Sequence, residues 1–270
     1  MRSFALIAPP LALALAAAFP ADAKSDKSRV IKKALVQSVR VEVAAGGQVV
    51  AVASGVVVAA DETTSYVLTN AHVVAPAIDA KGGRLTVLVE RPTRLRLAAR
   101  LVATGKLPDE DLALLVNEKK LPVAPLAADE EVSVGDDVVV IGAPYGRALS
   151  VSSGIVSQLE TEEGGAQTAM KTDAPIGYGA SGGGVFDVPS GRLVGLVEGY
   201  RTARVAFMGA KSEELGFDVP MPGETFLSPP TKIRRFLRRA GLARMARLDR
   251  DHQPELQRAT PLKATAQAEP

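Results

Sequence analysis

Residues 38–59 read SVRVEVAAGGQVVAVASGVVVA, and this stretch sets the pattern for most of the chain. It holds two runs of β-forming residues, 38–43 and 49–59, with a glycine pair between them. Valine, branched at its β-carbon, favours strands, whereas glycine favours turns. The stretch therefore predicts two strands separated by a turn.

Similar short runs recur as far as residue 221, separated by Gly, Pro, Asp and Asn. They cover residues 66–69, 85–90, 95–102, 112–116, 137–141, 149–158, 167–172, 184–188, 193–198 and 217–221. About a dozen strands at this spacing, with no long helical pattern between them, are typical of antiparallel barrels or sandwiches. Residues 121–134, which contain prolines and acids, divide the runs into two series. We therefore expect an all-β protein with two β-domains.

The composition excludes several kinds of site. The chain has 270 residues, of which 47% are hydrophobic and 23% charged, which is enough apolar material for a buried core. The absence of cysteine excludes disulfides, cysteine-ligated zinc and a thiol nucleophile, and two histidines are too few for a multi-histidine metal site. We therefore expect no metal and no cofactor. A net charge of +2 is too small for a surface built to bind nucleic acid.

The N-terminus has the pattern of an export signal. Residues 1–23 combine Arg2, an apolar run and the small-residue site Ala21-Asp22-Ala23. Cleavage after Ala23 is predicted, and an exported protein without cysteine fits a periplasmic or secreted location.

The C-terminal part changes character after residue 227. Ser228-Pro229-Pro230-Thr231 ends the strand pattern and predicts a helix over about residues 229–241. Residues 232–250 carry eight Lys and Arg against one Asp, and residues 242–270 are expected to form a basic and then disordered tail. We favour a helix that packs its apolar face on the second β-domain and leaves its arginines solvated. A weak contact of residues 232–250 with an anionic membrane or an acidic partner is the alternative.

Three segments hold the groups that nucleophilic catalysis by a serine requires. They are TNAHVV at 69–74, DLALL at 111–115 and GYGASGG at 177–183. A serine hydroxyl needs a neutral imidazole to accept its proton and a carboxylate to orient that imidazole. His72, Asp111 and Ser181 supply these groups, and Asp109 is a rival carboxylate in the loop before Asp111.

The glycines around Ser181 have a separate role. Glycine permits a tight turn, and the N–H groups of Gly179 and Ser181 could together bind the oxyanion of acyl transfer. The same letters also fit the dinucleotide fingerprint G-x-G-x-x-G at 177–182. That fingerprint requires a helix to follow, and GGVFDVP at 183–189 cannot open one, so nucleotide binding is excluded.

These segments resemble motifs of the trypsin-like serine peptidases, and most closely those of the bacterial HtrA/DegP group. LTNAHVV at 68–74 resembles the histidine motif, DLALL at 111–115 the aspartate motif, and TDAPIGYGASGG at 172–183 the serine motif. ASGV at 53–56 and GFDVP at 216–220 are further matches. The resemblance spans about residues 37–240.

The resemblance implies a double six-stranded antiparallel β-barrel with a C-terminal helix. The protease domain would cover residues 24–241, with a first barrel over about 37–120 and a second over about 122–221. The site would lie in the cleft between the barrels. There His72 would act as general base and then acid, Asp111 would orient it, and Ser181 would form the acyl-enzyme.

The resemblance also implies how substrate binds. An extended polypeptide would pair with the strand around Leu196, Val197 and Glu198. Ile176 would help to line the primary specificity pocket, which lacks an acid and so favours a small or medium apolar residue before the cleaved bond.

The expected function is that of an exported serine endopeptidase that acts on unfolded polypeptides in envelope quality control. A homo-oligomer is compatible with this expectation. The alternative is a catalytically silent trypsin-like fold that binds peptides or serves as a scaffold, because Ala180 stands where the group usually has Asn and Gly184 where it commonly has Pro. Residues 201–215 resemble no part of the family. The 28 residues after Leu242 are too few for the PDZ domain typical of the group, so none is expected.

Overall fold

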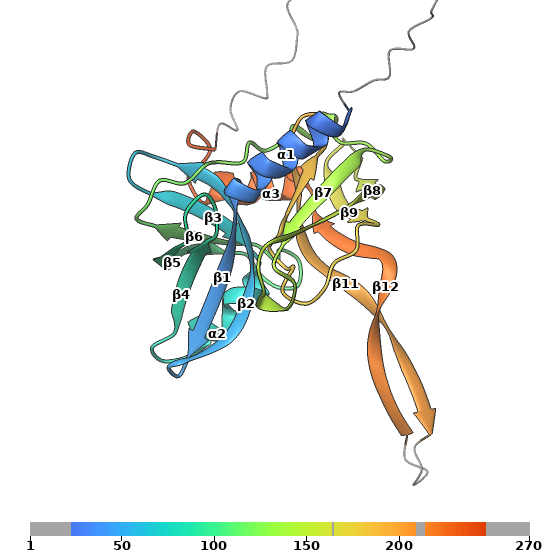
Figure 1. Cartoon of the computed structure of the whole chain (residues 1–270), viewed down its shortest axis with the longest axis horizontal. Coiled ribbons are helices and arrows are strands. Elements are labelled where there is room, and N and C mark those ends of the chain that lie inside the picture. The colour runs from blue at the N-terminus through green and yellow to red at the C-terminus, as the bar shows by residue number, and fades with distance from the viewer. Residues whose placement is uncertain (1–22, 164, 209–213, 247–270) are drawn as a thin grey trace, which may run out of the picture.

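Two closed, six-stranded antiparallel barrels form the body of the molecule in this computed structural model (Figure 1). The structure describes residues 23–163, 165–208 and 214–246. The strand order is β1-β2-β3-β6-β5-β4 in the first barrel and β10-β11-β12-β9-β8-β7 in the second. The expected all-β double barrel is thus confirmed.

The first barrel follows directly from the valine pattern. Its strands are β1 (Ser38–Ala45), β2 (Gln48–Ala60), β3 (Ser65–Thr69), β4 (Arg84–Val89), β5 (Leu95–Thr104) and β6 (Ala113–Asn117). Val39, Val41 and Val43 alternate into the barrel core, as a half-buried strand requires. Gly46 and Gly47 make the turn between β1 and β2, both with positive φ.

The second barrel follows a linking segment that contains the short 3-10 helix η1 (Asp129–Glu131). Its strands are β7 (Asp137–Gly142), β8 (Ser150–Thr161), β9 (Gln167–Thr172), β10 (Gly184–Asp187), β11 (Leu193–Met208) and β12 (Glu214–Ser228). A second 3-10 turn, η2 (Pro144–Gly146), follows β7. β12 continues to Ser228, beyond the bound of about 221 expected for this barrel.

Two helices lie where none was expected. α1 (Ala23–Gln37) packs Val30, Ile31 and Ala34 onto the apolar cluster that joins the two barrels. α2 (Ala71–Asp79) is rich in apolar residues and contains Pro76, so its sequence does not favour a helix. It forms because Val73 and Val74 are buried in the core of the first barrel.

The expected C-terminal helix is present as α3 (Pro230–Arg239). Ile233, Phe236 and Leu237 are buried in the cluster between the barrels. Its basic residues are not all solvated, which corrects one expectation. Arg234 is buried and donates to the Ala127 carbonyl at 2.6 Å, because the helix brings it against the linking segment. Lys232 and Arg239 are ion-paired with Glu198 and Glu110.

The predicted export signal lies almost entirely outside the described residues, as do residues 247–270 of the tail. None of the helices within the described ranges is long and apolar enough to cross a membrane.

β11 and β12 extend well beyond the second barrel as a two-stranded ribbon, drawn in orange (Figure 1). Residues 202–208 of β11 pair with residues 214–220 of β12. This ribbon contains residues 202–208, 214 and 215 of the segment that resembled no part of the family, and also GFDVP at 216–220, which did resemble it.

Candidate active site

Strand pairing brings His72 and Asp111 together. β3 and β6 are adjacent, with Thr69 opposite Ala113. The first turn of α2, which carries His72, therefore lies beside the residues that precede β6. The His72 backbone N–H donates to Asp111 Oδ1 at 2.9 Å, and His72 Nδ1 lies 2.6 Å from Asp111 Oδ2. Asn70 Nδ2 donates to the Asp111 carbonyl at 2.7 Å. The Asp111 carboxylate is thus fixed against both the backbone and the ring of the histidine.

This geometry selects between the two candidate carboxylates. The Asp111 side chain is 13% exposed, whereas Asp109 is exposed in the preceding loop. A carboxylate at Nδ1 favours the tautomer in which that nitrogen carries the proton, which leaves Nε2 as the acceptor. Nε2 is the atom that must accept a serine proton, and 43% of the His72 side chain is exposed.

Ser54 of β2 holds the turn that carries Ser181. Its backbone N–H donates to the Ser181 carbonyl at 2.9 Å, and its hydroxyl donates to the Gly179 carbonyl at 2.7 Å. The same hydroxyl accepts the Ala143 N–H at 2.9 Å, and the Ser54 carbonyl accepts the Thr69 hydroxyl at 2.8 Å. Ser54 is fully buried, so the first barrel positions the turn of the second barrel that carries Ser181. In the sequence, Ser54 stood out only as part of the ASGV segment at 53–56, to which no role was assigned.

The turn before Ser181 leaves two backbone donors available. The Ala180 N–H donates to the Gly177 carbonyl at 3.0 Å, and Gly179 has a φ of +88°, which L-residues rarely adopt. In the part of the chain that the structure describes, neither the Gly179 N–H nor the Ser181 N–H donates to a protein acceptor. A Cβ atom on Gly182 would lie 2.2 Å from the Ser54 carbonyl oxygen, so this close approach requires glycine.

The serine and histidine halves of the site are not yet hydrogen-bonded. No hydrogen bond joins Ser181 Oγ to His72 among the described residues, whereas the contact between His72 and Asp111 is complete. Such catalytic hydrogen bonds are often long in ligand-free proteins and shorten only in the complex with substrate.

Of the three residues expected to pair with substrate, some of the hydrogen-bonding groups are already bonded within the protein. Leu196 and Val197 are fully buried, and the backbone of Val197 is bonded in both directions to Gly182 and Gly183 at 2.9 Å. The Glu198 carboxylate accepts from Ser228 and from Lys232, so its side chain is directed toward β12 and α3. Backbone pairing on this strand is therefore open only from Glu198 onward.

Ile176 is partly buried and packs against the apolar core of the second barrel. It lines a cavity of about 40 Å³ together with Val140 of β7 and Ser150 and Ser152 of β8, and no residue of β11 lines that cavity. The role of Ile176 in the primary specificity pocket stays a prediction.

Three tyrosines beside the serine turn were not expected from the sequence. The Tyr145 and Tyr178 ring centroids lie 6.5 Å apart, and Tyr178 meets Tyr200 edge-on at 5.7 Å. Burial, followed by the adjacent Tyr178 hydroxyl, raises the pKa of Tyr200 to about 12. The Tyr200 hydroxyl is buried without a hydrogen bond of good geometry to another described residue, although Tyr178 lies close enough to affect its pKa.

No group of three or more His, Asp or Glu residues that could hold a metal ion occurs within residues 23–163, 165–208 and 214–246. The candidate groups described above are an imidazole paired with a carboxylate, and a serine on a turn with two available backbone donors.

Comparison with known proteins agrees with this geometry. The family model for the trypsin-like peptidase domain matches residues 53–196, which is more than half of the chain. The chain belongs to the trypsin-like peptidase family. It is 35% identical over 185 residues to a Pseudomonas fluorescens protein named "Probable periplasmic serine endoprotease DegP-like", covering 67% of this chain and 36% of that protein. It is 36% identical over 183 residues to the periplasmic serine endoprotease DegP of Escherichia coli, covering 65% and 35%.

Solved structures of trypsin-like peptidases have the same arrangement. A serine endoprotease from Yersinia pestis superposes with a TM-score of 0.60 at 25% identity, covering 79% of this chain and 66% of the other. A variant of the HtrA-type protease AlgW with a tripeptide superposes with a TM-score of 0.58 at 25% identity, covering 79% and 62%. This chain spans about a third of the length of the two sequence relatives.

Proposed function

We propose that this trypsin-like peptidase is an exported serine endopeptidase that hydrolyses unfolded polypeptides in the periplasm, in envelope protein quality control. The observation that carries the proposal is the pair of hydrogen bonds between Asp111 and His72, one at the backbone N–H and one at Nδ1. That arrangement fixes the tautomer and the orientation that a general base for Ser181 needs. The periplasmic names of the relatives support the location.

The reaction uses each group in turn. His72 Nε2 accepts the Ser181 proton as Oγ attacks the substrate carbonyl, and the N–H groups of Gly179 and Ser181 bind the resulting oxyanion. Asp111 stabilises the imidazolium, which then donates its proton to the leaving amine. Water, activated by His72, hydrolyses the acyl-enzyme and restores the free serine.

The departures from the usual motif are compatible with an active turn. Ala180 is buried with its side chain near Gly142, and Gly184 pairs with Leu196 as the first residue of β10. We assign residues 24–241 as the protease domain, in which substrate backbone pairs with β11 from Glu198 onward.

Labelling with a fluorophosphonate tests the proposal on the protein comprising residues 24–270. Such a probe reacts with a serine only when a base activates it and an oxyanion site accepts its oxygen. We expect rapid labelling of the native protein and none of Ser181→Ala. A folded protein that remains unlabelled at all probe concentrations would contradict the proposal and favour the silent peptide-binding alternative.

A further inference from the structure

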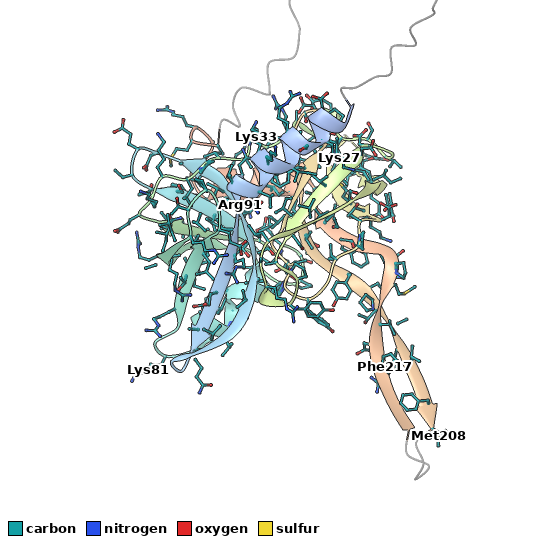
Figure 2. All side chains as sticks on the ribbon, viewed as in Figure 1. Lys27, Lys33, Lys81, Arg91, Met208 and Phe217 are labelled. Atoms are coloured by element: carbon teal, nitrogen blue, oxygen red, sulfur yellow. The ribbon has the colours of Figure 1, made fainter. Side chains whose placement is uncertain are left out.

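The ribbon formed by β11 and β12 has one apolar face. Directly opposite residues of an antiparallel pair lie on the same face, and faces alternate along each strand. Ala203 is paired with Val219 and Val205 with Phe217, so these residues share a face, which Phe207 continues. The ribbon projects from the body of the molecule, with Phe217 and Met208 labelled along it (Figure 2).

This face is open to solvent. Val205 is 44% exposed, Phe207 50% and Phe217 56%, and the two phenylalanine rings meet edge-on at a centroid distance of 6.4 Å. The other face carries Arg204 and Asp218, whose charged groups lie 4.0 Å apart. A two-stranded ribbon is only marginally stable alone in water, and a contiguous exposed apolar surface marks a site of interaction.

The ribbon is continuous with the candidate active site through β11. Val197 of this strand is bonded to Gly182 and Gly183, directly after Ser181, and farther along Tyr200 contacts Tyr178. Among the described residues, no strand pairs with the other edge of β11 after Val197. A strand edge that is unpaired in the described residues therefore runs from the serine turn onto the ribbon, with irregularities at Glu198 and Arg201.

The direction of this edge determines which part of a bound polypeptide would reach the ribbon. All strand pairs that form the two barrels are antiparallel. An added strand that pairs in the same sense would have its C-terminal end at Ser181 and its N-terminal end along the ribbon. Antiparallel partners advance residue for residue except at the two irregularities, so the apolar face would meet residues roughly 5 to 10 positions before the scissile bond.

We propose that the apolar face of the ribbon, formed by Ala203, Val205, Phe207, Phe217 and Val219, binds the extended, apolar-rich segment of substrate that precedes the scissile bond. This inference rests on the proposed endopeptidase function and adds a substrate class to it. The preferred substrates are unfolded chains with apolar residues upstream of the cleavage site, in addition to the residues that contact Ser181.

Quenched fluorogenic peptides test this proposal in the intact protein. The peptides share a short core with a small or medium apolar residue before the candidate scissile bond. They differ in a ten-residue extension that alternates Val or Phe with Thr, or that contains only Ser and Thr, placed on the N-terminal or the C-terminal side. We expect the apolar N-terminal extension to raise kcat/KM at least tenfold, mainly through KM, and the other extensions to change it less than twofold.

A variant with Val205→Thr, Phe207→Ser and Phe217→Ser should lose this gain while it still cleaves the short peptide at the native rate. A matched variant of the opposite face, Arg204→Gln with Asp218→Asn, should retain the gain. Circular dichroism checks that both are folded, and the comparison of extensions in the native protein does not depend on either variant.

Binding to Ser181→Ala, measured by fluorescence anisotropy, separates this inference from the proposed function. Tighter binding of the apolar N-terminal extension, without cleavage by the native protein, would support the ribbon site and refute the endopeptidase. Cleavage of short peptides without any effect of the extension would overturn the ribbon site alone. The site would equally be overturned if the triple variant lost only self-association or only binding to phosphatidylglycerol vesicles, because a second copy or lipid would then cover the face.

Discussion

The Ser54 hydroxyl links the first barrel to the turn that holds Ser181, so its removal tests how the site is built. In Ser54→Ala the Gly179 carbonyl and the Ala143 N–H both lose their partner. Each buried group left unsatisfied costs about 1–3 kcal/mol of stability. The bond from the Ser54 backbone N–H to the Ser181 carbonyl is retained, so only the Gly179 side of the turn is loosened.

The effect on reactivity can be estimated from the transition-state stabilisation that one oxyanion donor contributes. Removing such a donor costs about 2.7–4 kcal/mol, or roughly 100- to 1000-fold in rate. Ser54→Ala does not remove the Gly179 N–H but frees it to turn away from the oxyanion. We therefore expect fluorophosphonate labelling to be roughly 10- to 100-fold slower, which corresponds to about 1.4–2.7 kcal/mol.

A second buried serine provides a matched control. Ser65 on β3 is equally buried, and its hydroxyl also donates to one carbonyl, that of Lys119, and accepts one amide, that of Leu121. Ser65→Ala should therefore lose a similar amount of stability in urea unfolding but label at the native rate. Both variants are compared at a temperature at which each is fully folded. Equal labelling rates for Ser54→Ala and Ser65→Ala would refute the positioning role of Ser54.

Two further predictions concern the histidine partner and the buried tyrosine. Asp111→Asn should lower kcat roughly 10⁴-fold, because the histidine would adopt the wrong tautomer, whereas Asp109→Asn should leave kcat unchanged. Both variants are measured on one peptide substrate. A large loss of kcat in Asp109→Asn would assign the orienting role to Asp109 instead. Because the pKa of Tyr200 is raised from 10.0 to about 12, the folded state holds this proton more tightly, so stability present below pH 10 is lost as the pH rises toward 12. Tyr200→Phe should be no less stable than the native protein at pH 7, because the lost hydroxyl has no well-formed hydrogen bond. Between pH 10 and 12 the urea midpoint of the variant should fall less than that of the native protein. Parallel curves of urea midpoint against pH would contradict this prediction.

The strands could be predicted, and the candidate catalytic groups identified, because their signals are local. Alternating valines in residues 38–43 fix one buried face, and the segments around His72, Asp111 and Ser181 carry their chemistry within a few residues. The helix α2 could not be predicted, because it is short and contains Pro76, and it depends on the burial of Val73 and Val74 in the first barrel.

Other features depend on contacts between residues far apart in the chain. The sequence around Ser54 does not indicate that its hydroxyl donates to the carbonyl of Gly179, 125 residues later in the chain. Leu196 and Val197 were expected to meet substrate, but pairing with Gly184, Gly182 and Gly183 occupies their backbone. Only the assembled second barrel shows that the open edge of β11 begins at Glu198.

The sequence by itself determined the all-β fold, the residue types of the proposed triad and the glycine turn, because each is encoded by side-chain period or by residue type over short spans. The tertiary structure decided which carboxylate binds His72, which residue holds the turn that carries Ser181, and that residues 202–208 and 214–220 leave the barrel as a ribbon with one exposed apolar face. The physical reason is that hydrogen-bond partners and burial depend on which surfaces the fold brings together, and a linear pattern of apolar residues is the same whether its face is covered or open.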